Sequence, residues 1–184
     1  AAMKKKRTFM NLVPLLLMWL VLSVILWGFV FTRITTYQPQ EIVALYADSE
    51  LVQEKALAQM LYREGDGLKA VQVRPFSYAM FGGDELRNAD LFIIPRENLD
   101  LYRECFAPWP KEMETEGVFH AWDGVNYGLK VYDAETKEGM AKSYILYENH
   151  LYVPQDYYLF FGNQSVHMED GLAAEYANRL LNIE

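Results

Sequence analysis

The longest run of apolar residues in the chain lies near the N-terminus, from Leu12 to Phe31, and contains no charged residue. A helix needs about twenty apolar residues to cross the hydrocarbon core of a bilayer. The cations at 4–7 precede this run, and by the positive-inside rule they place the N-terminus in the cytoplasm. The pattern predicts a transmembrane signal-anchor helix over residues 12–31, after a basic cytoplasmic N-terminus over residues 1–11.

A cleaved signal peptide is the main alternative to this anchor. Its apolar core is normally shorter and is followed by small residues at a cleavage site, whereas Val30 to Arg33 follow here. The sequence therefore favours an uncleaved anchor, then a linker over residues 32–41 and an extracytoplasmic domain over residues 42–184. The predicted location is a bacterial cell membrane, crossed once.

Beyond the linker, short apolar runs alternate with a helical pattern. Residues 42–47, 69–76 and 90–95 are rich in strand-forming side chains, and the last run suits a strand buried on both faces. Between the first two, residues 50–65 repeat apolar side chains at spacings of three and four, which indicates an amphipathic helix. Strand, helix and strand with short joints predict parallel pairing.

The second half of the domain continues the alternation less regularly. We expect a helix over residues 96–106, paired strands within residues 118–135 and a buried strand at 157–162. The last amphipathic helix, within residues 165–182, would carry Glu169 and Asp170 in its first turn. The predicted fold class is α/β, with a mostly parallel sheet and flanking helices in a single lobe.

The charge of the chain is unevenly placed. Lys4 to Arg7 and Arg33 account for five of the 17 Lys and Arg residues, and the first of the 25 acidic residues is Glu41. Residues 34–184 therefore hold 12 cations and 25 carboxylates, a net charge of −13. Nucleic acid is excluded as a partner, because its binding depends on Lys and Arg at the phosphates. A solute bound by so acidic a domain is expected to be neutral or cationic.

Ligands of open parallel sheets bind beyond the carboxyl ends of the strands. Helix capping is the alternative role for Asp48 and Ser49, and it is the commoner one for such residues. The turn at Gly162 and Asn163 is expected at the same end. The candidate ligand-binding residues are Asp48, Ser49, Ser77, Tyr78, Arg96, Glu97 and Tyr127.

Aromatic residues are plentiful, and Trp and Tyr can stack on sugars or anchor a protein interface. Core packing is the commoner fate for any one of them. Trp109, between two prolines, is predicted to be the most exposed. The candidate partner-binding residues are Trp109, Trp122 and Lys130.

Signatures of catalysis are missing from the sequence. It has no Gly-x-Ser-x-Gly motif, no phosphate-cradling glycine loop and no dinucleotide fingerprint. The three histidines do not have metal-ligand spacing, and the lone cysteine has no partner for an intramolecular disulfide. We therefore expect no cofactor, no metal and no enzymatic activity.

The order of elements resembles the first lobe of type II periplasmic (extracellular solute-binding) proteins. In that resemblance "IVALYAD", "VRPFSYAM" and "ADLFIIP" are the first three strands, "DGVNYGLKVYD" is the crossover strand, and "YYLFFGNQS" with the final helix is the return segment. The resemblance implies a membrane-anchored solute-binding-like module, accessory to an ABC-type transporter or a surface sensing complex.

The chain departs from that family in one large respect. Family members insert a second lobe after the crossover strand, but here only residues 134–156 separate it from the return strand. That length is too short for a lobe with its own core. The alternative function is therefore a protein–protein interaction module that has lost solute binding, with a partner expected near Tyr127 and Lys130.

Overall fold

The computed structural model describes residues 2–35, 37–76, 84–113, 115–148 and 153–183. The candidate ligand residues Ser77 and Tyr78 lie outside these ranges. The chain divides into two compact units, residues 1–38 and residues 39–184, and each is considered by itself.

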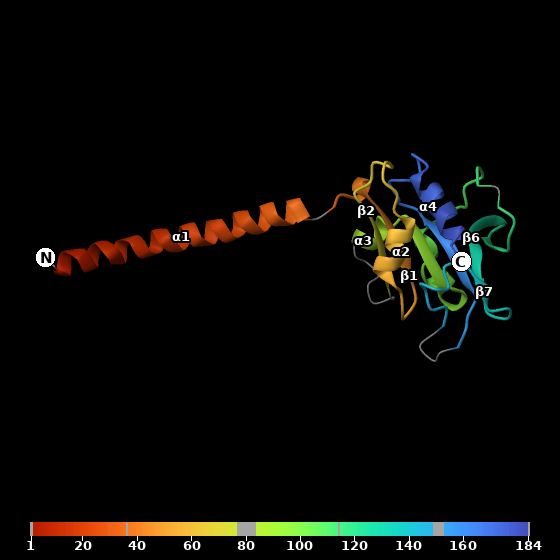
Figure 1. Ribbon diagram of the computed structural model, residues 1–184. Helices are drawn as coiled ribbons and strands as arrows, with labels where there is room; N and C mark the ends of the chain where they lie inside the picture. The colour runs from red at the N-terminus through yellow and green to blue at the C-terminus, as the bar shows by residue number, and fades with distance from the viewer. Residues whose placement is uncertain (1, 36, 77–83, 114, 149–152, 184) are drawn as a thin grey trace. The chain divides into compact units, whose positions relative to one another are not determined.

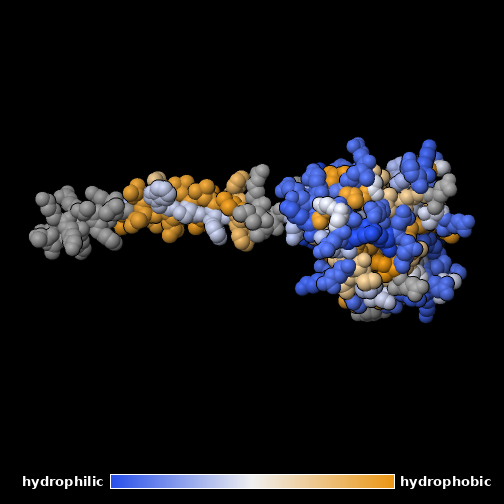
Figure 2. Space-filling view, turned by 45° about the horizontal axis from the view of Figure 1, so that its top comes forward, coloured by the Kyte–Doolittle hydropathy of each residue, from blue (hydrophilic) through white to orange (hydrophobic). Residues whose placement is uncertain are grey.

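The first unit is a single helix, α1 (Ala2–Thr35). Its stretch Val13–Phe31 has a mean hydropathy of 2.5, and none of that stretch is buried against other residues. Figure 2 shows hydrophobic side chains over most of the coloured length of this helix. Among the described residues it is the one helix long and apolar enough to cross a membrane, and it has the features of a membrane anchor or a signal sequence.

The second unit is built on one sheet of eight strands (Figure 1). Along the sheet the order is β2-β1-β3-β8-β6-β5, while β4 pairs with β8 and β7 pairs with β6. The strands are β1 (Ile42–Ala47), β2 (Ala70–Pro75), β3 (Leu91–Pro95), β4 (Phe106–Ala107), β5 (Phe119–Trp122), β6 (Val125–Asp133), β7 (Glu138–Gly139) and β8 (Tyr157–Gly162). All five segments that carry the family resemblance thus contribute strands to this sheet.

The sheet is mixed, so the prediction of a mostly parallel sheet is wrong. β1 pairs in parallel with β2 and β3, as the strand–helix–strand pattern requires. In contrast, β8 runs antiparallel to β3 and β6, and β5 runs antiparallel to β6. Asp123 and Gly124 join β5 to β6 with φ of 53° and 80°, and a two-residue turn in this left-handed region makes an antiparallel hairpin.

Two helices pack on one face of the sheet, α2 (Glu54–Leu61) and α4 (Leu172–Leu181). Leu57, Leu61 and Tyr176 from these helices share a core with Leu45 and Ile93 of the strands. All five side chains are at most 1 % exposed. This face therefore holds the larger, mainly aliphatic core.

The other face of the sheet has an aromatic core. It is covered by the short helix α3 (Asp84–Arg87) and the 3-10 helices η3 (Arg96–Leu101) and η4 (Arg103–Cys105). Rings from neighbouring strands lie in contact, for example those of Phe106 and Phe160, whose centroids are 4.0 Å apart.

The helices differ from the sequence prediction in three places. The helix predicted over residues 50–65 is confined to α2, and the one predicted over residues 96–106 is a pair of 3-10 turns. Glu169 and Asp170 precede α4 and are not in its first turn. Gly171, with φ of 78°, has a left-handed conformation that a right-handed helix cannot include, so α4 begins after it.

Candidate functional site

The carboxyl ends of β1 and β3 lie at the same edge of the sheet because the two strands are parallel. Asp48 follows β1, and Arg96 and Glu97 follow β3. Tyr157, the first residue of β8, lies opposite Pro95 at this same edge. We call this group of residues the distal end of the sheet, because the chain enters the domain at Pro39, before the start of β1.

Two amide side chains hold the carboxylates of the distal end. Asn98 Nδ2 donates a hydrogen bond to Asp48 Oδ2 at 2.7 Å, and Gln155 Nε2 donates one to Glu97 Oε2 at 2.9 Å. Within the described part of the chain, neither carboxylate forms an ion pair with a cation. Both carboxylates are therefore oriented without being neutralised.

Carboxylate charges act on two side chains at the distal end. Burial raises the pKa of Asp48 and the nearby charge of Glu97 raises it further, while the hydrogen bond from Asn98 opposes both. The pKa of Tyr157 is raised by burial and then by the charges of Asp48, Glu97, Glu50 and Glu148. Such a site can accept hydrogen bonds and offset the charge of a cation.

Ser49 belongs to the packing of this end and is buried. Its Oγ donates to the backbone oxygen of Leu146 at 2.5 Å and lies 3.2 Å from that of Leu51. The capping role considered for Asp48 and Ser49 is wrong, because α2 begins at Glu54 and Gln53 occupies its N-cap position. Arg96 is exposed at this end, and its backbone N–H donates to Asp156 O.

Three residues expected at the distal end lie at the opposite end of the sheet. Because β8 is antiparallel to β3, its last residue, Gly162, donates its backbone N–H to Asp90 O, and Asn163 donates to Cys105 O. Tyr127 precedes Gly128, which pairs with Phe160 near that end of β8. The expectation that Tyr127, Gly162 and Asn163 join Asp48 is therefore wrong.

Trp122 lies with Tyr127, and their ring centroids are 5.2 Å apart. The Trp122 indole N–H donates to Asp100 Oδ1 at 3.2 Å, and the Arg103 guanidinium lies 5.4 Å from the ring centroid. Both aromatic side chains are half-buried. They form part of the aromatic face and leave one edge in contact with solvent.

Trp109 is buried, so its predicted exposure is wrong. Its side chain is 8 % exposed, its indole N–H donates to Met113 O at 3.2 Å, and its ring centroid lies 5.0 Å from that of Phe161. The flanking prolines do not expose the ring, which packs in the aliphatic core against Phe119 and Phe161.

Lys130 is neutralised inside the domain. Its Nζ lies 2.5 Å from Asp133 Oδ2 and 2.9 Å from Asp156 Oδ2, and its side chain is 17 % exposed. Lys130 and two backbone N–H groups hold the pKa of Asp133 at about 2. A side chain with two carboxylate partners is a weak candidate for contact with another protein.

A second polar network, not identified from the sequence, lies at the proximal end, where the chain enters the domain. The Asp90 carboxylate, 1 % exposed, accepts from the backbone N–H of Ala44 at 2.7 Å and from Ser165 Oγ at 2.5 Å. Burial raises the pKa of Asp90 against the effect of these hydrogen bonds. Its sequence signal is slight, a single aspartate before a buried strand.

His167 completes this proximal network. Its Nδ1 lies 3.0 Å from Asp170 Oδ2, and its Nε2 lies 2.9 Å from Ile42 O and 3.2 Å from Pro39 O. Both ring nitrogens face only acceptors, so both must carry a hydrogen. Burial lowers the pKa of His167, but the Asp170 hydrogen bond and the Asp90 charge raise it more. The histidine, with a hydrogen on each ring nitrogen, therefore joins the segment that leads into α4 to the start of the domain.

No group of three or more His, Cys, Asp or Glu side chains in the described ranges is arranged to hold a metal ion. No family model, no curated protein and no solved structure was found to match this chain.

Proposed function

We propose that this chain is a single-pass membrane-anchored protein whose α/β domain lies outside the cytoplasm and acts as a solute-binding-like module. The basic residues at 4–7 followed by the apolar stretch Val13–Phe31 support the anchor and its orientation. The module would serve an ABC-type transporter or a surface sensing complex, in a bacterial cell membrane. Its task is binding and not catalysis.

The orientation has a direct test. Protease added to intact cells that express the full chain should degrade residues 39–184 and leave a membrane-embedded fragment that contains α1. Full protection of the domain until the cells are lysed would place it in the cytoplasm. Release of the intact domain into the medium without protease would indicate a cleaved signal peptide.

The single observation that carries the binding proposal is the pair of carboxylates at the distal end. Asp48 and Glu97 are held by Asn98 and Gln155, which orient their oxygens without cancelling their charge. Asp48 is also half-buried, and an oriented, partly desolvated carboxylate binds a cationic group more strongly than a free surface carboxylate does, while exposed Glu97 adds negative charge beside it. The solute class that fits is a small amine-bearing molecule, or a neutral one that donates hydrogen bonds.

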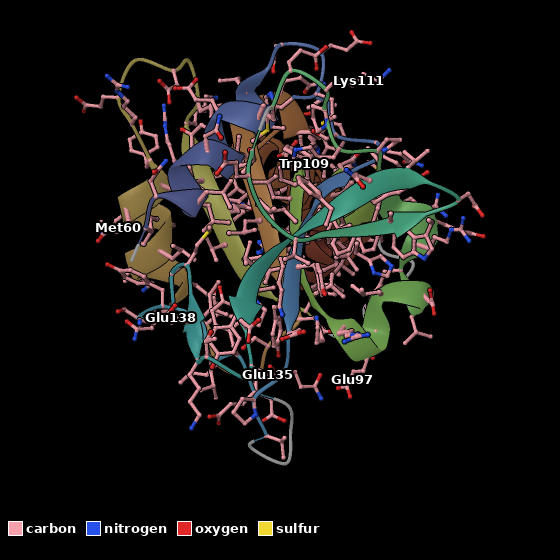
Figure 3. All side chains as sticks on the ribbon, turned by 90° about the vertical axis from the view of Figure 1, so that its right-hand side faces the viewer. Met60, Glu97, Trp109, Lys111, Glu135 and Glu138 are labelled. Carbon is pink, nitrogen blue, oxygen red and sulfur yellow. The ribbon has the colours of Figure 1, made fainter. Side chains whose placement is uncertain are left out.

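The location of the distal end suits this role. β1 runs from Ile42 to Ala47 and spans about 20 Å, so the carboxylates lie at the other end of the sheet from Pro39. Figure 3 shows Glu97 at the end of the domain away from Trp109 and Lys111. The distal end is therefore separated from Pro39 by the length of β1.

The test is a binding screen on the full chain in nanodiscs, by thermal shift and calorimetry, against amino acids, polyamines, sugars and short peptides. The double variant Asp48→Asn/Glu97→Gln should weaken binding of a cationic hit by about ten-fold or more. The control Glu135→Gln/Glu138→Gln removes the same charge from exposed positions at the β6–β7 turn. Equal losses in both variants, or no hit at millimolar concentration, would contradict solute binding.

The alternative function is a protein–protein interaction module. The observation that favours it is the apolar surface at the β5–β6 hairpin, where Val125 is 44 % exposed and pairs with half-buried Trp122, which contacts half-buried Tyr127. A photo-crosslinking residue at Val125, compared with one at Glu135, should capture a specific membrane protein in intact cells. Identical products from both positions would remove the support for this surface.

A further inference from the structure

A groove of about 490 Å³ lies between the turn at Pro110–Met113 and the residues that lead into α4. We call the turn at Pro110–Met113 the first bank of the groove and the residues that lead into α4 its second bank. Figure 3 shows Trp109 and Lys111 on the segment that forms the first bank, next to α4. The floor is apolar and consists of Pro110, Met113, Met168 and Ala174. We call this feature the α4 groove.

The charged residues that line the α4 groove are all acidic: Glu112, Glu169 and Asp170. Glu112 and Glu169 are exposed, and no ion pair is recorded for either within the described part of the chain. Asp170 has one carboxylate oxygen on His167 and the other on the backbone N–H of Leu172. The groove thus combines an apolar floor with a rim of one charge sign.

Both banks of the groove are fixed by hydrogen bonds. On the first bank, Met113 N donates to Pro110 O at 3.1 Å, and the buried Trp109 indole donates to Met113 O at 3.2 Å. On the second bank, Ala173 N donates to His167 O at 3.1 Å. A groove whose walls are already ordered loses little conformational entropy when it binds.

We propose that the α4 groove binds a basic segment of a partner protein, with one or two apolar side chains on the floor and Lys or Arg side chains at the rim. Charge complementarity selects this occupant, because Glu112 and Glu169 present exposed carboxylates at the rim of a domain whose net charge over residues 34–184 is −13. Half-buried Met168 favours a peptide over a single small molecule, since a flexible thioether side chain adapts to varied apolar partners.

The α4 groove is separate from the solute site proposed at the distal end. Asp170 holds His167, which contacts Pro39 and Ile42, so the groove lies at the proximal end of the domain. A solute at Asp48 and a partner at Glu112 could therefore be bound at once. The groove proposal does not depend on solute binding.

The experiment uses the full chain in nanodiscs of zwitterionic lipid and a fluorescent peptide of about ten residues, with lysines and leucines among glycine and serine. Anisotropy at low salt gives the dissociation constant, after subtraction of empty nanodiscs. The variant Glu112→Gln/Glu169→Gln should weaken binding by about five-fold or more. Glu135→Gln/Glu138→Gln, which removes the same charge elsewhere, should change it by less than about two-fold.

A second variant tests the floor. Met168→Gln keeps the charge and similar volume but removes apolar contact, and it should weaken the lysine–leucine peptide while leaving a lysine–serine peptide unchanged. Equal losses in the rim variant and the control would show general attraction to an acidic domain and overturn the proposal. Absence of peptide binding would also overturn the proposal. So would self-association of the chain that is abolished by Glu112→Gln/Glu169→Gln, because the occupant of the groove would then be a second copy of the chain.

Discussion

The two ends of the sheet each have an aspartate whose pKa is raised by burial, but the surroundings of the two differ. Asp90, at the proximal end, accepts hydrogen bonds from Ala44 and Ser165 and lies near the charged His167. Asp48, at the distal end, accepts one from Asn98 and lies near the like charge of Glu97. A raised pKa alone therefore does not identify a binding residue.

The difference lies in how completely each buried charge is satisfied. A buried carboxylate with enough donors stabilises the fold, and its removal leaves those donors unpaired. A carboxylate that is oriented but not neutralised retains unfavourable energy that a ligand can relieve. On this reasoning we assign a structural role to the proximal network and propose binding only at the distal end, and four predictions test the distinction.

The largest effect is expected for Asp90→Ala. The change leaves Ala44 N–H and the Ser165 hydroxyl without an acceptor and removes the negative charge near His167, so the free energy of unfolding should fall by about 3 kcal/mol. Denaturant unfolding of the full chain in detergent measures it. The matched change at the distal end, Asp48→Ala, should cost less than about 1 kcal/mol. Equal losses of unfolding free energy for Asp90→Ala and Asp48→Ala would contradict the distinction between the two ends of the sheet.

His167→Leu should lower the free energy of unfolding by about 2 kcal/mol, since the carboxylate of Asp170 and the carbonyl of Ile42 lose their donors. His120→Leu is the control. Its ring is half-buried, Nε2 has no hydrogen-bond partner in the described part of the chain, and burial lowers its pKa. His120→Leu should leave the free energy of unfolding nearly unchanged. A larger loss for His120→Leu than for His167→Leu would refute the structural role given to His167.

The dependence of stability on pH follows from the same histidine. The pKa of His167 in the folded state is raised above 6.5 by Asp170 and Asp90 despite burial, so the folded state holds its proton more tightly. This stabilisation is fully present below pH 6.5 and is lost as the pH rises through the folded-state pKa. Burial lowers the pKa of His120, so protonation of that side chain destabilises the folded state, and it does so only below pH 6.5.

Unfolding should therefore become easier as the pH rises above 6.5, and His167→Leu should remove most of this slope. The pKa of Asp170 is lowered by His167 and Leu172 against the effect of burial, so its contribution is lost only in acid, below 3.8. A flat profile for the unmodified chain would mean that His167 is neutral when folded.

The smallest effect on stability is expected for Asp48→Asn. The change keeps the shape of the side chain and removes a partly buried charge beside Glu97, so the free energy of unfolding should change by less than about 0.5 kcal/mol. The measurement is the melting temperature of the full chain in detergent at neutral pH. A loss as large as that of Asp90→Ala would show that Asp48 is a structural residue.

The segments of the sheet are well predicted by local pattern. The expected strands at 42–47 and 157–162 are β1 and β8 with the same bounds, and that at 90–95 differs from β3 by one residue. Buried strands consist of consecutive apolar residues, so the pattern itself marks them. Asp48 and Glu97 were placed correctly at one end because β1 and β3 are parallel.

The rest of the candidate site depends on contacts between distant residues. Gln155 reaches Glu97 across 58 positions of sequence, and His167 reaches Ile42 across 125. No local periodicity encodes such pairs. Asn163 lies at the opposite end from its predicted position because a strand has the same pattern in either direction and β8 runs opposite to β3. Tyr127 lies there because it is near the start of β6, and only the end of β6, at Tyr132, pairs with Tyr157 at the distal end.

The sequence by itself determined the apolar N-terminal helix, the buried strands and the acidity of the domain, because hydrophobic burial and charge are additive along a chain. Only the tertiary structure decided the direction of β8, the burial of Trp109 and which aspartate accepts hydrogen bonds from several donors. Those outcomes are set by packing and hydrogen bonds between segments that the chain brings together only when it folds.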